Sequence, residues 1–470
     1  AQHGLIESTL IDIQGIGLSI RLDSLSMLML GMIALLGFII VKFSIQYLSG
    51  DASQGAFMGR LAATIAAVQV LVLAGNIGLL FIAWLSTSLT LHRLLLFYPE
   101  RVGAQIAAKK KFIIARLGDA FFLIALGLLY YEFGTGNLQA IFEAIQTATP
   151  KTHSFLLIES STVLLALVAI LKSAQFPTHG WLIEVMETPT PVSALLHAGI
   201  LNAGPFLIVR LSPIMDLGTA SPVLLVLVGG FTALFASVVL LTQSSVKVAL
   251  GYSSAAHMGF MLLVCGLGVY SAAMLHLVAH SFYKAHAFLS SGSVVEAAAA
   301  KKITLPKRTG NTLRIALSFV MATGIYAAFA LLSGVDVFQN PALLAIGIIL
   351  ILGMTQIIAP ITDSKVKGYS ILQGAALAAV VAVSFFVLEA LAHRLLSPVL
   401  PSESVPTLLT LVLTSVVIIV FALTVLLQIY APSLTNSNTT RAIYVHLRNG
   451  LYANDLMNQM IGANKQIIKK

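Results

Sequence analysis

Residues 161–186 read "STVLLALVAILKSAQFPTHGWLIEVM", an apolar run that carries Lys172 near its middle and Pro177 shortly after it. The run is long enough to cross a bilayer as a helix, which takes roughly 17 to 25 residues. A proline at this depth frees backbone groups, and these are tolerated only inside protein or beside a wet cavity. The stretch therefore predicts a membrane helix that is broken close to a buried lysine.

The composition of the whole chain supports this interpretation. Of the 470 residues 58% are hydrophobic and 10% are charged, and the mean hydropathy is +0.95, whereas soluble domains carry about 25% charged residues. Lipid-exposed backbone must satisfy its own hydrogen bonds, so we expect an all-α integral membrane bundle. The single cysteine, Cys265, excludes a disulfide framework within the chain and any all-cysteine metal or iron–sulfur site.

Apolar runs recur from one end of the chain to the other and predict about thirteen spanning helices. They are expected at 25–48, 58–75, 77–97, 112–131, 160–187, 191–213, 222–242, 246–268, 271–292, 313–333, 342–361, 370–394 and 407–431. Residues 25–431 would then form one transmembrane domain. We expect no cleavable signal before the first span, and a processed or trimmed N-terminus because the chain begins with Ala1.

The basic residues predict the orientation of these helices. One side collects most of them, including the run Lys109, Lys110 and Lys111, and the other side holds Arg21, Lys151 and Arg394. The positive-inside rule places the basic side in the cytoplasm, which also accounts for the net charge of +9. Residues 1–24 would be extracytoplasmic, and residues 432–470 a cytoplasmic segment.

The C-terminal segment is less apolar than the spans and ends in basic residues. Its sequence over 435–470, "TNSNTTRAIYVHLRNGLYANDLMNQMIGANKQIIKK", is typical of a short amphipathic helix at the cytoplasmic surface or against a partner. A partly ordered tail is the alternative. No P-loop and no dinucleotide-binding glycine pattern occurs, so the chain shows no signature for ATP or NAD.

A second informative stretch is "HLVAHSFYKAH", residues 276–286, in an otherwise apolar run. His276, His280 and Lys284 are spaced i, i+4 and i+8, so they share one helix face, and His286 follows. Ionisable groups at membrane depth are costly, at least ~2.5–3.5 kcal/mol for a lysine, and usually mark ion pathways or structural pairs. Three interpretations compete: a zinc site, polar contacts between helices, and a proton relay. We favour the relay, because histidine titrates near neutrality and no acid or cysteine completes a metal site.

Other ionisable groups in predicted spans extend this set. His197 lies in the span after the break, and Lys247 begins the span before the histidine helix. Arg116 and Asp119, at i and i+3, are expected to form a structural ion pair. Glu184, His257 and Glu389 could belong to a pathway or be satisfied core groups. His92 and Arg93 are expected near a cytoplasmic helix end, where an arginine can reach the water.

Several stretches, in the same order, resemble the antiporter-like membrane subunits of respiratory complex I and of Mrp cation/proton antiporters. They are "LDSLSMLMLGMIALLGFIIVKFSIQYL", "ARLGDAFFLIALGLLY", "LKSAQFPTHGWLIEVMETPTPVSALLHAGILNAG", "FTALFASVVLLTQSSVKVALGYSSAAHMGFM" and "HSFYKAHAFLSSGSVVE". The resemblance covers about residues 20–300 and is weak beyond. It implies two inverted five-helix repeats, each with a broken helix, and a row of buried charges that conducts protons. Lys172, His197, Lys247 and Lys284 match the relay positions of the family.

The sequence also departs from the family. A glutamate follows the tryptophan that opposes the first lysine in the family, but here Leu85 follows Trp84. Lys172 therefore needs another carboxylate, such as Glu184. The second helix break is expected near Pro360, followed by Asp363 and Lys365, and at least one N-terminal family helix is missing.

Within the superfamily, "FPTHGWLIEVMETPTPVSALLHAGILNAGPF" and the modest chain length look most like the membrane subunits of DAB-type complexes, which accumulate dissolved inorganic carbon. The resemblance implies a bacterial inner membrane and a large cytoplasmic DabA-like partner with a zinc site like that of a β-carbonic anhydrase. Ion flow, of H⁺ or Na⁺, would drive CO₂ hydration in the partner. This chain would hold no cofactor, and the zinc would belong to the partner. The alternatives are a proton-pumping subunit of an NADH or ferredoxin:quinone oxidoreductase, an Mrp-type antiporter subunit, and a structural anchor with a degenerate relay.

Overall fold

The computed structural model describes residues 4–147, 154–292, 311–333, 341–362, 368–401, 407–430 and 438–462. Twelve of the described helices are long and apolar enough to cross a membrane, which confirms the predicted polytopic all-α bundle. The remaining predicted span corresponds to α13 (Tyr270–Leu289), whose 20 residues also suffice for a crossing. Its histidines and lysine make it more polar than the other twelve.

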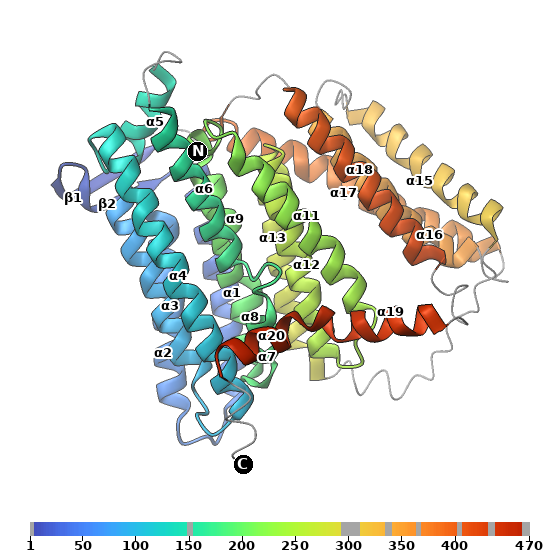
Figure 1. Cartoon of the computed structure of the whole chain (residues 1–470), viewed down its shortest axis with the longest axis horizontal. Helices are drawn as coiled ribbons and strands as arrows, with labels where there is room; N and C mark the ends of the chain where they lie inside the picture. Colours follow the sequence, from blue (N-terminus) through green and yellow to red (C-terminus); the bar gives the residue numbers. More distant parts are fainter. Residues whose placement is uncertain are drawn as a thin grey trace.

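The described helices form two groups that lie side by side (Figure 1). The first group contains the long helices α1 (Ser24–Tyr47), α2 (Gln54–Leu73), α3 (Ile77–Leu95), α4 (Val102–Phe133), α6 (Phe155–Lys172), α11 (Ala220–Leu240), α12 (Val246–Gly266) and α13, and the shorter helices α5 (Leu138–Thr147), α7 (Gly180–Glu184), α8 (Thr190–Ala198), α9 (Ala203–Arg210) and α10 (Ser212–Met215). The second group contains α15 (Thr312–Ser333), α16 (Pro341–Thr362), α17 (Gly368–Leu396) and α18 (Leu408–Tyr430).

The span predicted at 160–187 is interrupted, as its sequence indicates. Helix α6 ends at Lys172 and α7 begins at Gly180, with Pro177 between them. The backbone of this segment finds partners inside the bundle: the amide of Phe176 donates to Thr232 Oγ1 on α11 at 3.1 Å. The break is therefore held by protein, as irregular backbone at membrane depth requires.

The next predicted span, 191–213, is interrupted as well. Helix α8 ends at Ala198, a short 3₁₀ turn covers 200–202, and α9 begins at Ala203. Almost every side chain from Thr190 to Arg210 is buried. This span is thus the central element of the first group, surrounded by other helices rather than by lipid.

Helices α11 and α12 pack backbone against backbone. A Cβ atom added at Gly229 would lie 2.6 Å from the carbonyl oxygen of Gly259, and one added at Gly259 would lie 2.5 Å from that of Gly229. Small residues at such a crossing allow close helix packing, which stabilises association in a membrane. This contact fixes α12, which carries His257.

The N-terminal segment is a β-hairpin, a departure from the otherwise helical fold that the sequence did not predict. Strands β1 (Ile6–Ile13) and β2 (Ile16–Leu22) are antiparallel. The turn residues Gln14 and Gly15 both have positive φ, 54° and 79°, and the amide of Gly15 donates to Asp12 Oδ1. A two-residue turn of this kind matches the strand twist of a hairpin. The hairpin and α5 lie at the end of the bundle opposite to α7 (Figure 1).

The run Lys109–Lys111, predicted to be a loop, is helical instead. Helix α4 begins at Val102, well before the predicted start at residue 112, and buries Lys110 and Lys111. Three consecutive lysines are typical of a solvated loop, but their long aliphatic stems pack well against apolar surface. Both charges consequently lie inside the first group.

In the second group, α16 continues through Pro360 and ends at Thr362, so no interruption within this span is present at the predicted second break. Asp363 and Lys365 lie outside the described residues. This group has a hydrophobic core of its own, formed by side chains such as Tyr326, Met354 and Phe386.

The predicted amphipathic C-terminal segment contains α19 (Asn438–Arg448) and α20 (Ala453–Met460), joined by a short turn at 450–452. Helix α20 lies across the end of the first group that carries α7, and α19 extends from there past the end of α11 (Figure 1). Helix α20 packs against α7 although 270 residues separate Glu184 from Asn454.

Candidate functional site

The first lysine of the expected relay, Lys172, ends α6 at the helix break. Its Nζ atom donates to Thr87 Oγ1 at 3.2 Å and to Ser88 Oγ at 3.3 Å, both on α3. The same ammonium lies 4.2 Å from the ring centre of Trp84, a cation–π contact. Lys172, Ser88 and Trp84 line a cavity of about 20 Å³, which is room for a single water molecule.

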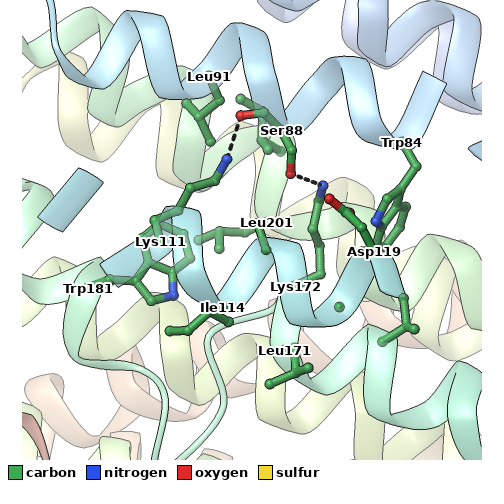
Figure 2. A pocket seen from close by; sticks show the side chains of 14 residues that line it. Trp84, Ser88, Leu91, Lys111, Ile114, Asp119, Leu171, Lys172, Trp181 and Leu201 are labelled. Carbon is green, nitrogen blue, oxygen red and sulfur yellow. Dashed lines mark hydrogen bonds between the residues drawn. The ribbon is translucent and has the colours of Figure 1, made fainter. Parts of the chain in front are cut away.

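The carboxylate of Asp119 faces this lysine. Asp119 comes from α4 and forms an ion pair with Arg116 at 2.6 Å, as the sequence predicted. It also lines the cavity with Lys172, and Figure 2 shows its carboxylate beside the ammonium group. The structure thus places a carboxylate near Lys172 despite Leu85 at the family's glutamate position. Sequence reasoning assigned Asp119 a structural role only.

Glu184 does not take the place of that glutamate. It ends α7 and pairs with Lys110, with 2.7 Å between Lys110 Nζ and Glu184 Oε1. The proposal that Glu184 opposes Lys172 is therefore wrong for this conformation.

Lys111 is the functional candidate that sequence reasoning missed. Its Nζ atom donates to the carbonyl oxygen of Ser88 at 2.6 Å, so Lys111 and Lys172 meet at the same serine (Figure 2). The side chain is 5% exposed and lines the same cavity. A signal was present: Lys111 and Asp119 are eight residues apart and so share a helix face, as His276 and Lys284 do.

His197 lies at the centre of the bundle, on α8. It is fully buried, and its ring stacks on Phe288 of α13 with 4.3 Å between ring centres. Neither ring nitrogen has a hydrogen-bond partner among the described residues. Buried polar atoms nearly always have a partner, and an exception in a native structure often has a functional reason, so His197 remains a candidate functional residue.

The face of α13 predicted from the i, i+4, i+8 spacing is present and points into the bundle. Lys284 is fully buried and donates to the carbonyl oxygen of Leu250 on α12 at 3.1 Å. The ring of His280 lies 5.0 Å from that of His257 and 6.3 Å from that of His276, centre to centre. Both ring nitrogens of His280 lack a partner among the described residues.

His257, which the sequence left open, belongs to this cluster. Its Nδ1 atom lies 2.9 Å from His276 Nε2, a hydrogen bond in which one ring donates and the other accepts. A direct imidazole–imidazole bond can pass a proton when both rings exchange tautomers. His257, His276 and His280 thus form a compact triple between α12 and α13.

The other predicted relay residues lie further out. Lys247 is the second residue of α12 and makes a long contact of 3.4 Å to Thr190 Oγ1. His286 is exposed on another face of α13, away from the triple. Glu389 of α17 accepts a hydrogen bond from Ser271 Oγ at 2.6 Å, so it connects the second group of helices with the start of α13.

A buried ion pair at the hairpin end was also missed. Arg210 of α9 donates to both carboxylate oxygens of Asp23, at 2.5 and 3.2 Å, and Arg21 Nε donates to Asp23 Oδ2 at 2.8 Å. Burial alone would raise the pKa of Asp23, but the charge of Arg210 and the hydrogen bonds from Arg210, Arg21 and Ser26 hold it well below its usual range. Asp23 also caps α1 through Ser26, a signal that the sequence "DSLS" carried.

The donor set argues against a metal site in the histidine helix. Within the residues that the structure describes, no group of three His, Cys, Asp or Glu side chains could hold a metal ion. Since the nitrogens of His257 and His276 that face each other form a hydrogen bond, they do not converge on a common ligand.

Comparison with known proteins identifies relatives over most of the chain. Residues 74–331 match the sequence model of the family described as "NADH:quinone oxidoreductase/Mrp antiporter, TM", and residues 11–58 match that of "NADH-Ubiquinone oxidoreductase (complex I), chain 5 N-terminus". The chain is 36% identical over 439 residues to "Probable inorganic carbon transporter subunit DabB2" of Halothiobacillus neapolitanus, which covers 93% of this chain and 79% of that protein. It is 42% identical over 286 residues to the DabB subunit of Hydrogenovibrio crunogenus, covering 61% of this chain and 55% of that one.

Respiratory subunits are related too. NADH-quinone oxidoreductase subunit L of Mycobacterium tuberculosis is 35% identical over 324 residues, 68% of this chain and 50% of that one. Among solved structures, the Mrp complex from Dietzia sp. DQ12-45-1b has a TM-score of 0.67 at 21% identity, covering 99% of this chain and 54% of that one. This structural likeness shows the shared fold.

Proposed function

Because the chain belongs to the NADH:quinone oxidoreductase/Mrp antiporter family, we propose that it is the ion-conducting subunit of an energy-coupled complex that hydrates CO₂. In this proposal a cation gradient, of H⁺ or Na⁺, drives one-directional CO₂ hydration in a cytoplasmic partner, and the cell accumulates bicarbonate. The similarity to the DabB2 subunit over 93% of this chain favours inorganic carbon as the coupled chemistry.

The observation that carries ion conduction is the row of buried titratable side chains in the first group of helices. It begins with Asp119, Lys111 and Lys172 around one cavity. Its other members are His197 on α8, Lys284 on the adjacent α13, and the hydrogen-bonded pair of His257 and His276. An ionisable group is costly to bury in a membrane, and those that occur there usually serve a function or are paired. His197 and His280 have no hydrogen-bond partner among the described residues.

In the proposed cycle the residues of this chain hold and pass protons. Lys172 would release its proton toward His197 when Asp119 moves away from it, and take a new one when the carboxylate returns, because an opposite charge favours the protonated lysine. Lys284 would do the same with the histidine triple. The free energy suffices: one elementary charge moving across 100 mV supplies ~2.3 kcal/mol, whereas a tenfold ratio corresponds to ~1.4 kcal/mol.

The partner implied by this proposal is a large cytoplasmic DabA-like subunit with a zinc site like that of a β-carbonic anhydrase. The zinc would belong to the partner, since the described residues of this chain offer no three-ligand group. The proposed location is a bacterial inner membrane with the C-terminus in the cytoplasm. Its support is the positive-inside rule and the position of Lys109, whose Nζ donates to the carbonyl oxygen of Ile461 beside α20.

A second candidate function is that of a proton-pumping subunit of a quinone oxidoreductase or of an Mrp-type antiporter. The 35% identity to subunit L and the fold shared with the Mrp complex favour it. It uses the same relay and differs in its partners.

Identification of the partners separates the two candidates. The chain would be tagged, purified gently from native membranes, and the co-purifying proteins identified and assayed for metal. One large soluble zinc protein is expected, and deletion of either gene should then abolish growth at ambient CO₂. Recovery of quinone-oxidoreductase or small antiporter subunits would contradict the inorganic-carbon proposal and establish the second candidate.

A further inference from the structure

The C-terminal helix α20 lies on the charged pair that closes one end of the first group of helices. Asn454 Oδ1 accepts from Lys110 Nζ at 2.6 Å, and Asn454 Nδ2 donates to Glu184 Oε1 at 2.9 Å. Asn458 Nδ2 donates to the same oxygen at 3.3 Å. Two amides from the end of the chain therefore complete an ion pair formed by α4 and α7.

Helices α7 and α20 pack tightly against each other at this contact. A Cβ atom added at Gly180, the first residue of α7, would lie only 2.0 Å from Asn454 Oδ1, so α20 rests where a larger residue would exclude it. On either side of it, Lys109 Nζ donates to the carbonyl oxygen of Ile461 at 3.0 Å, and Gln243 Nε2 donates to that of Arg448 at 3.1 Å. The segment is thus fastened to α4, α7 and the end of α11.

Helix α7 connects this contact with the relay. Its Trp181 lines the Lys172 cavity together with Lys111, and the indole Nε1 has no partner among the described residues. Its Glu184 and Gly180 face α20. Lys110 and Lys111 are likewise neighbours on α4, one bound to Glu184 and the other to Ser88. Any displacement of α7 or of this turn of α4 therefore reaches the cavity.

The cluster also lies at the border between water and the bundle interior. The Glu184 side chain is 20% exposed, whereas that of Lys110 is completely buried. The second carboxylate oxygen of Glu184, Oε2, is buried and has no partner among the described residues. An oxygen in this position is free to accept a proton or coordinate a cation that arrives from the aqueous side.

We propose that Glu184 and Lys110 form the aqueous access site of the relay and that α20 is its gate, closed in this structure by Asn454 and Asn458. When α20 is docked, the amides hold Glu184 against Lys110 and cover the path to Lys111 and Lys172. When it lifts, the Glu184 carboxylate takes up a proton or cation from the aqueous side, or releases one that has come through the relay. This inference rests on the proposed ion conduction but not on the identity of the partner.

The first test compares ion flux through the complete complex in proteoliposomes, measured with an entrapped pH dye. The double variant Asn454→Ala/Asn458→Ala should raise flux about tenfold, because it removes hydrogen bonds of ordinary strength from the closed state. Gln459→Ala is the matched control, an exposed amide on the same helix, and should conduct like the wild type. Lower flux in the double variant, with the complex intact, would show a merely structural role and overturn the proposal.

The second test locks the gate. In Gly180→Cys/Asn454→Cys the Cβ atoms would lie about 3.1 Å apart, near the ~3.8 Å typical of a disulfide. Oxidation should abolish flux in the double variant and a reductant should restore it, while the flux through either single variant, whatever its level, should not change when the same oxidant is added. A locked complex that conducts normally would overturn the gate. If Lys284→Ala also conducts normally, the relay itself is wrong, so the two failures are distinguishable.

Discussion

The two groups of helices differ in the ionisable side chains that they bury. The first group buries lysines, histidines and carboxylates from α4 to α13. In the described parts of α15–α18, the only acidic side chain is Glu389, which bonds to Ser271 of the first group, and the core is apolar. The family pattern predicts two broken helices, yet α16 continues through Pro360. We infer that conduction is concentrated in one half of the bundle, with the other half acting as an apolar support.

The largest effect is expected at the Asp23–Arg210 pair, which fixes the N-terminal hairpin to the first group. Asp23→Ala leaves Arg210 buried without its partner and should cost about 3–5 kcal/mol of stability, measured by thermal unfolding of the purified protein. The pKa of Asp23 is lowered in the folded state, so the pair stabilises the protein above pH 3.8 and less as the pH falls below it; the variant should lack this dependence. Asp12→Ala, in the exposed hairpin turn, should stay within ~0.5 kcal/mol.

The comparison predicts that the buried lysines of the first group matter for conduction and that an exposed charge of the second group does not. Lys284→Ala should lower flux by about 100-fold, the contribution expected of a positioned proton-transfer group, while the complex remains assembled. Lys172→Ala should behave alike. Arg394→Ala, on an exposed position of α17, should leave flux unchanged. Equal losses of flux in Lys284→Ala and Arg394→Ala would contradict the inference that conduction is concentrated in the first group.

Variants of Asp119 test whether this carboxylate compensates for Leu85, which occupies the position of the family's glutamate. Asp119→Asn should reduce flux about tenfold, since Lys172 loses the nearby charge that favours its protonated form. Adding Leu85→Glu should recover part of the flux, because it restores the family arrangement beside Trp84. Leu85→Gln in the same background is the uncharged control. Recovery with glutamine as well would mean that packing, not charge, limits conduction.

The smallest effect is expected at Glu389, the contact between the two groups. Glu389→Gln can still accept the hydrogen bond from Ser271, so flux should fall by less than about threefold. A loss as large as that of Lys284→Ala would place the second group on the pathway and contradict the proposed division.

The spans and the break at Pro177 could be predicted because hydropathy and proline chemistry are properties of short stretches. The face shared by His276, His280 and Lys284 followed from helical spacing in the same way. What could not be predicted depends on distant contacts: Lys110 is buried because Glu184 and Asn454 meet it. Asp119 faces Lys172 because α4 and α6 pack together, which no local pattern reveals.

The misplaced lysine run shows the limit most clearly. Lys109, Lys110 and Lys111 have one chemistry and consecutive positions, yet they bond to Ile461, to Glu184 and to Ser88 respectively. Composition assigns all three to a loop, and only the packing of a helix separates them. The hairpin escaped prediction for a related reason, since its turn geometry at Gln14 and Gly15 gives little signal beside a strongly apolar helix.

The position of α20 in the chain has a consequence for biogenesis. Helices α4 and α7 are synthesised and inserted long before α20 emerges from the ribosome, so Lys110 and Glu184 initially face water without Asn454 or Asn458. With the proposed gate, a nascent chain is therefore open to ions until α20 docks. Translation order thus makes sealing a late step of assembly, and chains that stall before residue 454 would drain the gradient that the finished protein uses.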